Sequence, residues 1–450
     1  MRIRAMLMIL ACLGLMPIGV WATPAKEKSP QGDVAPLRSF DVQHYSVHLD
    51  PDVDAGTLRG QVVIQLDLVA AGATRLDFDV GALTIDAVRA DGQSLPFEVA
   101  DRRLQVTLAR KHPRGKRLRI EVDYHGAPKF GMEFHPQRGE IYTIFSTSQW
   151  MPCIDAPDER ASLDLRVLLP IDARMIGNGS EISARKQRDG RRLHHWRLRE
   201  SVPSFTYGFA AGRYREVALH DGGLSLRYLS GALDERQLRR VFAETPDMLR
   251  FFGEKTGIPY RGRYSQALVA KTIGQEMAGL AVLSEAYGQG VLDGSHDVGL
   301  IAHEVAHQWW GVGVTCLDWG HFWLNEGLVT FMTAAYLQHR HGDAVYRERV
   351  AGWKQRVERL RAEGKDRPLV YARWVAPTAD DRAVVYVKGA YAIAQLREEL
   401  GEEAFWGGIR AYTQANQGQS VVTSDLRAAM ERSSGRDLSA FFARWAGSGE

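Results

Sequence analysis

The spacing of hydrophobic positions divides the chain into a first part that alternates and a second part with helical periodicity. Apolar and polar residues alternate in several segments of the first part: 61–68, 103–108, 117–124 and 162–169. In the first segment, Val62, Ile64 and Leu66 fall on one face of an extended strand. Turn-forming clusters such as DAGT and HPRGK separate the segments. This pattern predicts antiparallel β-sheet with one face toward solvent.

The second part of the chain shows the spacing of amphipathic helices. Within residues 233–257, Leu238, Val241 and Phe242 recur at helical intervals, and Gly257 is a typical stop signal. Most of the remaining chain continues in the same way, so we expect it to be mostly helical.

The length of 450 residues favours more than one domain, because a single core seldom grows that large. The hydrophobic spacing changes near residues 213–222. We therefore expect an α+β multidomain protein with an N-terminal β domain at 38–215 and a mostly helical domain at 216–450.

The first 22 residues have the pattern of a secretory signal peptide. Arg2 and Arg4 precede an apolar run at 6–20, and a small-residue cleavage site ends at Ala22. The polar stretch 23–37 reads as a flexible linker. We therefore expect a periplasmic or secreted protein. The apolar run is short for a membrane span, and no other run is long enough, so no stable span is expected after cleavage.

Net charge bears on the kind of binding partner, and the cysteine content bears on disulfide bonding. Without Arg2 and Arg4 the basic total falls from 57 to 55, against 54 acidic residues. A balance this close to neutral gives no reason to expect nucleic acid as a partner. Cys153 and Cys316 remain after cleavage, and they are either two buried thiols or a disulfide.

The segment HEVAH carries the clearest chemistry in the sequence. On a helix, His303 and His307 lie one turn apart on the same face and can present two nitrogens to one metal ion. Glu304 lies about 100° around that helix, close enough to reach a metal-bound water. The alternative is a solvated helix face that matches the pattern by chance.

A catalytic zinc needs a third protein ligand and one open position. Asp318 and His321 are candidates in the connecting segment. Glu326 is the better candidate, because it lies nineteen positions after His307 near the start of a second helical stretch. The alternative is that Glu326 binds no metal and only stabilises the N-terminus of that helix through its negative charge.

These residues resemble the aminopeptidase N family of zinc metallopeptidases, gluzincins that include leukotriene hydrolase. That family carries HExxH, eighteen residues and then Glu, and residues 303–326 match it together with their aromatic residues and the WLNEG ending. Other segments are also similar to the family: 152–165, 204–214, 384–393 and 401–450. The similarity therefore extends over nearly all of 38–450.

The resemblance implies a saddle-like β domain followed by a thermolysin-like domain. It also implies one Zn²⁺ per chain, held by His303, His307 and Glu326. Glu304 matches the general base, and Tyr386 matches the tyrosine that donates a hydrogen bond to the transition state. If the alignment of VVYVKGAYAI were shifted, that tyrosine would be Tyr391 instead.

The chain departs from the family at the elements that bind the substrate's amino group. The family motif is Gly-x-Met-Glu-Asn followed by x-Gly-Leu, and alignment on residues 279–280 places Glu276 at the clamp glutamate. Met277 then stands where Asn is expected. No acidic residue lies between 142 and 153, where a second clamp element normally occurs, so Gln149 is the nearest polar substitute.

The resemblance predicts a zinc aminopeptidase that hydrolyses the N-terminal bond of peptide substrates. The chain stops where the family's C-terminal helical domain would begin, which predicts an open cleft or a roof from another subunit of a homo-oligomer. The altered clamp leaves a zinc endopeptidase or another hydrolase as an alternative. A further alternative is an inactive zinc-binding peptide receptor, although Glu304 and Tyr386 are both present.

Overall fold

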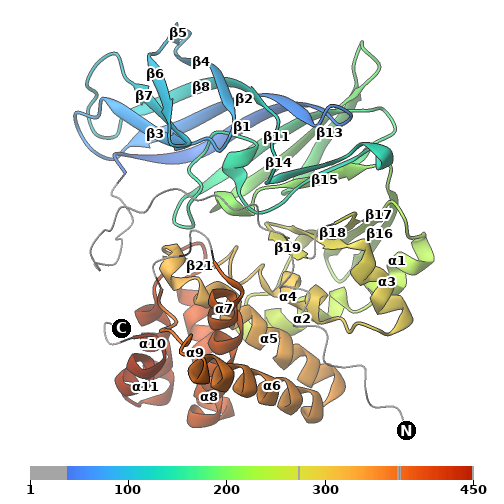
Figure 1. Cartoon of the computed structure of the whole chain (residues 1–450), viewed down its shortest axis with the longest axis vertical. Helices are drawn as coiled ribbons and strands as arrows, with labels where there is room; N and C mark the ends of the chain where they lie inside the picture. The colour runs from blue at the N-terminus through green and yellow to red at the C-terminus, as the bar shows by residue number, and fades with distance from the viewer. Residues whose placement is uncertain (1–37, 272–273, 372–373, 375–376, 448–450) are drawn as a thin grey trace.

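The computed structural model describes residues 38–271, 274–371, 374 and 377–447. The predicted signal peptide and linker lie outside these described residues. Sheets from the first half of the chain form one end of the molecule, and helices from the second half form the other (Figure 1). None of the described helices has the length and apolar character required to cross a membrane.

An eight-stranded sheet dominates the N-terminal β domain. Its strand order is β13 (Ser180–Lys186), β14 (Arg192–Pro203), β11 (Arg160–Leu169), β1 (Phe40–Asp52), β2 (Thr57–Leu68), β8 (Arg117–Gly126), β4 (Thr84–Ala90) and β5 (Gln93–Ser94). The alternation predicted at 117–124 is observed, because Leu118, Ile120 and Val122 are buried. Pairing is antiparallel except between β1 and β11, which are parallel with Val47 opposite Leu165. These two strands are far apart in sequence, so no hairpin turn forces them to be antiparallel.

Two smaller sheets complete this domain. One has the order β12 (Arg174–Gly177), β15 (Phe209–Gly212), β10 (Glu140–Thr143) and β9 (Met132–His135), and the other β3 (Arg75–Asp79), β7 (Arg103–Thr107) and β6 (Phe97–Ala100). The domain also contains three short 3-10 turns: η1 (Pro136–Arg138), η2 (Thr147–Gln149) and η3 (Ser204–Thr206). All four residues of β10 are buried, and this strand touches the second domain.

The second domain begins with a five-stranded sheet whose first strand starts at Arg215. Its order is β16 (Arg215–Asp221), β17 (Leu224–Ser230), β18 (Gly262–Val269), β20 (Leu280–Ser284) and β19 (Gly274–Met277), which leaves β19 at an edge. The segment predicted as helical at 233–257 forms two helices, α1 (Glu235–Val241) and α2 (Thr245–Thr256). Pro246, in the first turn of α2, cannot continue a preceding helix and explains the division.

Helices make up most of the rest of the domain. They are α3 (Glu285–Asp293), α4 (Gly299–Ala306), η4 (Trp319–His321), α5 (Trp323–His341), α6 (Asp343–Ala362), α7 (Ala379–Arg382), the π-helical η5 (Ala383–Lys388), α8 (Gly389–Leu400), α9 (Glu402–Ala415), α10 (Thr423–Ser434) and α11 (Ser439–Trp445). Two short strands within this helical part, β21 (Thr315–Cys316) and β22 (Ser420–Val421), pair with each other in parallel. Residues 323–337 of α5 are almost all buried, so this helix runs through the centre of the domain.

Each domain has its own hydrophobic core. Cys153 belongs to the core of the β domain and Cys316 to that of the helical domain. Both thiols are buried and free. The interpretation as two buried thiols is therefore confirmed, and the two cysteines do not form a disulfide in this structure.

Candidate active site

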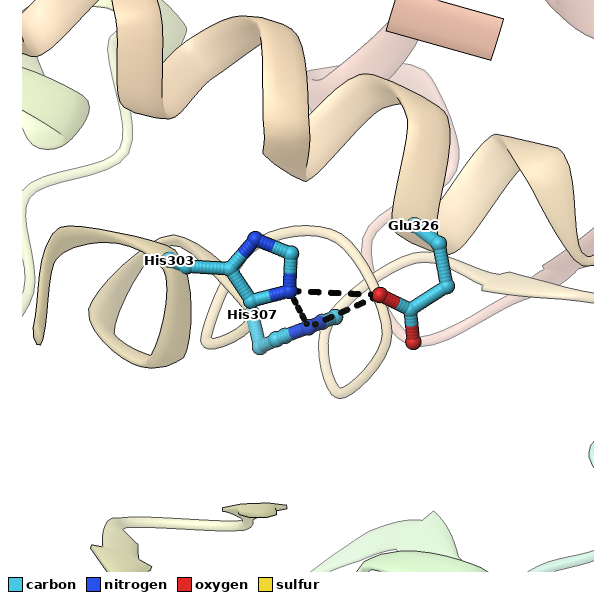
Figure 2. Close-up of side chains that lie close together, drawn as sticks. All are labelled: His303, His307 and Glu326. Carbon is cyan, nitrogen blue, oxygen red and sulfur yellow. Dashed lines mark hydrogen bonds and ion pairs between the residues drawn. The ribbon is translucent and has the colours of Figure 1, made fainter. Parts of the chain in front are cut away.

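Helices α4 and α5 bring three metal-binding side chains together (Figure 2). His303 lies on α4 and His307 directly follows its last residue, so one helical turn separates the two rings. Glu326 lies in the first turn of α5. The Nε2 atoms of His303 and His307 are 3.2 Å apart, and Glu326 Oε2 lies 3.2 Å from the first and 3.5 Å from the second.

These distances fit a single zinc ion. Ligand bonds of about 2.0–2.2 Å in tetrahedral geometry place neighbouring ligand atoms roughly 3.3–3.6 Å apart. The Nδ1 atom of His307 lies 2.9 Å from the carbonyl oxygen of Trp310, so Nδ1 carries the hydrogen and Nε2 presents its lone pair to the cluster. His303, His307 and Glu326 therefore form a cluster that could hold zinc, as the sequence predicts.

The two other candidate ligands have different roles. The Asp318 side chain accepts a hydrogen bond from the backbone nitrogen of Gly320 and so begins the turn η4. His321 is buried, and its Nδ1 lies 3.0 Å from the hydroxyl oxygen of Thr423. Neither side chain belongs to the cluster, and of the three candidates only Glu326 lies beside His303 and His307.

The charge around the cluster also suits a dication. Burial alone would lower the pKa of His307, but the nearby carboxylates of Glu326, Glu276 and Glu304 raise it to about 10. The pKa of Glu326 falls to about 2, because the attraction of the two histidines outweighs its burial. The carboxyl groups of Glu326, Glu304 and the half-buried Glu276 thus surround His307, and a bound cation would interact favourably with them.

Glu304 is poised beside the metal ligands without being one of them. Its side chain is buried, and Oε2 has no hydrogen-bond partner among the described residues. Burial raises the pKa of Glu304 above its usual range, and Glu276 and Glu326 add to this against the opposing effect of His307. A Cβ at Gly274 would lie 2.4 Å from Glu304 Oε1, so glycine is needed there to leave room for the carboxylate.

Tyr386 lies in the π-helical turn η5, and its ring stacks parallel to that of His303 with centroids 6.1 Å apart. Burial, together with the surrounding carboxylates, raises the pKa of Tyr386 well above 10, so its hydroxyl keeps its proton and can donate. Tyr391 instead packs edge-on against Trp445, with centroids 5.7 Å apart. The structure thus places Tyr386 at the site and gives Tyr391 a packing contact.

Strand β19 places Glu276 next to the metal ligands. Carboxylate oxygens of Glu276 and Glu304 lie within 4.8 Å of a ring nitrogen of His307 and of each other. Met277 is buried and lies against Gly208 and Thr143, away from this group. The residue that replaces the family's Asn is therefore a packing residue.

No contact in the described structure supports the predicted role of Gln149 in binding the substrate's amino group, so that role stays a prediction. The Gln149 side chain lies against Gly81 and Gly131 of the β domain, and the described contacts do not join it to the cluster. Sequence reasoning did not identify Gln275, whose amide bonds to both Glu276 and Phe145. Nothing in the local sequence marks that role, because Phe145 is 130 positions away.

The β-sheet domain, the helical domain and the cluster of His303, His307 and Glu326 together have the arrangement expected of a zinc metallopeptidase of the HExxH class. The family profile described as "Peptidase M1 N-terminal domain" matches residues 41–207, and "Peptidase family M1 domain" matches residues 281–445. The chain belongs to peptidase family M1, which agrees with the resemblance seen in the sequence.

Curated relatives resemble most of this chain. Leucine aminopeptidase 2 of Ajellomyces capsulatus is 24% identical over 82% of the chain and 62% of the relative. Aminopeptidase N of Lactococcus lactis is 25% identical over 91% and 51%, respectively. Leukotriene A-4 hydrolase of Xenopus laevis is 24% identical over 90% and 69%. The chain thus spans about half to two thirds of the length of these relatives.

Solved structures match along nearly their whole length. The M1 zinc metallopeptidase of Deinococcus radiodurans has a TM-score of 0.76 at 24% identity, covering 91% of this chain and 93% of that one. A variant described as a two-domain M1 zinc metallopeptidase bound to L-tryptophan has a TM-score of 0.77 at 25% identity, covering 91% and 94%. These matches show that the two-domain arrangement also occurs in other M1 peptidases.

Proposed function

We propose that this protein is a zinc aminopeptidase that removes the first residue of peptides. The observation that carries the proposal is the position of Glu276, a buried-site carboxylate next to Glu304 and His307. A carboxylate there can bind the α-ammonium of a substrate whose first carbonyl lies at the metal. The aminopeptidase names of the relatives support the same activity.

Each residue around the ligands has a distinct part in the proposed reaction. His303, His307 and Glu326 would hold a zinc ion, which would supply a Lewis acid for the scissile carbonyl and for a water molecule. Glu304 takes a proton from the attacking water and passes it to the leaving amine. The Tyr386 hydroxyl donates a hydrogen bond to the carbonyl oxygen as that oxygen becomes negative. Glu276 holds the ammonium group and so selects free amino termini.

The test compares two peptides that differ only by N-acetylation, assayed on wild type and on Glu276→Ala. We expect wild type to prefer the free amine strongly. The variant should lose roughly ten- to a hundredfold in kcat/KM on that substrate, because the contact joins two charged groups. Glu398→Ala, a change on the distant helix α8, is the control and should match wild type.

Equal cleavage of both peptides by wild type would contradict the aminopeptidase proposal and favour the endopeptidase alternative. An absence of cleavage of any peptide by zinc-loaded wild type would favour the receptor alternative. Both outcomes are measured as peptide cleavage by the wild-type protein.

We also propose that the protein acts in the periplasm or outside the cell, after removal of residues 1–22. The support is the basic, apolar and small-residue succession that ends at Ala22. Amino-terminal sequencing of the exported protein should give Thr23 as the first residue. Retention of Met1 in that material would contradict the proposal.

A further inference from the structure

Gln275 connects the proposed amine-binding carboxylate to the β domain. Its Nε2 donates hydrogen bonds to Glu276 Oε2 at 2.8 Å and to the backbone oxygen of Glu276 at 2.9 Å. Its Oε1 accepts a hydrogen bond of 2.8 Å from the backbone nitrogen of Phe145. The side chain is buried, with 3% of its surface exposed, so these bonds are shielded from water.

Glu276 needs such a donor because of its surroundings. It lies on the edge strand β19, and carboxylate oxygens of Glu276 and Glu304 lie within 4.8 Å of each other. Like charges at this distance repel strongly in a buried site, and a glutamate has three rotatable bonds through which to move away. The Gln275 amide hydrogen opposes that movement by fixing one carboxylate oxygen.

The other end of the Gln275 amide is held by an unusual backbone conformation. Phe145 has a φ of 52°, in the left-handed region that bulky residues seldom adopt. Strain of this kind persists only where the surroundings enforce it, and it marks functional positions. Here it aims the Phe145 amide at Gln275, which receives that bond from the neighbouring domain.

Strand β10 also holds the chain just before β19. Glu140 Oε1 accepts a hydrogen bond of 2.8 Å from the backbone nitrogen of Ala270, and the Tyr142 hydroxyl accepts one of 3.2 Å from that of Lys271. Strand β10 and the residue at 145 thus hold the second domain at three points that precede Glu276.

We infer that Gln275 is a positioning residue that fixes the Glu276 carboxylate for the substrate's α-ammonium and makes the β domain part of amine recognition. This inference rests on the proposed function. It assigns to Gln275 the second polar element that was expected at Gln149. Gln275 does not touch the reacting carbonyl, so its loss should affect ground-state binding of the amine more than the chemical step.

The test uses Gln275→Met, which keeps a buried unbranched side chain but removes the amide. We expect KM for a free-amine dipeptide to rise about tenfold with kcat within about twofold of wild type, as for a lost hydrogen bond to a charged group. Inhibition by L-phenylalaninamide should weaken to the same extent. Inhibition by 3-phenylpropanamide, which lacks the amine, should stay unchanged.

The control is Gln266→Met, which removes another buried glutamine amide from the same sheet, one that bonds to Thr245. It should leave KM, kcat and the inhibition by both compounds at their wild-type values. Zinc content and thermal unfolding establish that each variant is folded and loaded. If Gln275→Met does not fold, Gln275→Asn provides the same test, since it keeps an amide but withdraws it by one methylene.

Equal weakening of both inhibitors, or no change in either, would overturn the role of Gln275. Those results presuppose a wild type that prefers free amines. A wild type that cleaves free and acetylated peptides equally would instead overturn the proposed function itself, whatever the Gln275 variants do.

Discussion

At Glu304 a buried carboxylate oxygen has no hydrogen-bond partner among the described residues, which is costly unless the oxygen has a chemical use. Glu304→Gln keeps the size of the side chain but cannot accept a proton. We expect turnover to fall by about a hundred- to ten-thousandfold, the usual contribution of a general base. Zinc content should match wild type, because His303, His307 and Glu326 are unchanged, and metal analysis beside kinetics checks both points.

The opposite pattern should appear when a ligand is removed. Glu326→Ala leaves the base in place, so its lost activity should accompany lost zinc. Near-normal turnover by zinc-loaded Glu304→Gln would remove Glu304 from the proposed mechanism.

A second prediction at the residue scale concerns Tyr386. Its hydroxyl should matter chiefly when the carbonyl oxygen becomes negative, so Tyr386→Phe should lower kcat about a hundredfold and change KM little. Steady-state kinetics on a free-amine peptide measure both constants. Tyr391→Phe is the matched control, because its ring packs against Trp445, and it should behave as wild type. The reverse result would show that the tyrosines were aligned wrongly.

At the scale of elements, the close crossing of α5 with η5 and α8 aligns the site. A Cβ at Gly327 would lie 2.9 Å from both the Cα of Gly389 and the carbonyl oxygen of Val385. Gly327 directly follows the ligand Glu326, and Val385 directly precedes Tyr386. Contact between two glycines therefore sets the distance between a metal ligand and the proposed transition-state donor.

Gly327→Ala should force these elements apart. We expect a loss of about 1–3 kcal/mol in the free energy of unfolding, the usual cost of overpacking, together with a lower kcat. Gly352→Ala is the matched control, because Gly352 lies on α6 with no atom near the added methyl group. That change should stabilise the protein by up to about 1 kcal/mol, and denaturant unfolding measures both variants. Equal stability of the two variants would contradict the importance of the crossing.

Sequence patterns predicted elements with one buried face better than elements buried on both. The alternation at 117–124 identified β8, because one face of that strand meets solvent. Strand β18 was missed, since its last six residues are all buried between parallel neighbours and show no alternation. A continuous apolar run of this length does not distinguish a strand from a helix.

At the site, contacts between residues that are close in sequence could be predicted, and contacts between the two domains could not. That His303, His307 and Glu326 lie together could be predicted, because the spacing of the two histidines is a property of one helix and Glu326 lies in the first turn of the next long one. Their role as metal ligands stays a prediction. Gln275 could not be predicted, because its function depends on contact with Phe145 in another domain. The sequence suggested that Gln149 replaces the family's second clamp element. In the structure, the amide that bonds to the Glu276 carboxylate belongs to its neighbour Gln275.

At the scale of the whole molecule, polar contacts join the two domains on both sides of the site. Arg160 of β11 donates hydrogen bonds to the backbone oxygens of Val312 and Gly313, which follow the metal-binding helix. Asn178 donates to the backbone oxygen of Ala278, next to β19. The domain interface therefore supports the segments after His307 and after Glu276.

The contacts of β10 with Ala270 and Lys271, and of Phe145 with Gln275, have a consequence for how the protein matures. Domains tend to fold in the order in which they are synthesised, so the β domain forms before the helices that carry the metal ligands. The segment before Glu276 then reaches its final position only when the second domain, which is synthesised later, packs against the β domain. The predicted metal ligands come from α4 and the start of α5, whereas the proposed recognition of the amine involves both domains. If the proposed function holds, we expect a newly made molecule to acquire its preference for free amines last, when the two domains pack together.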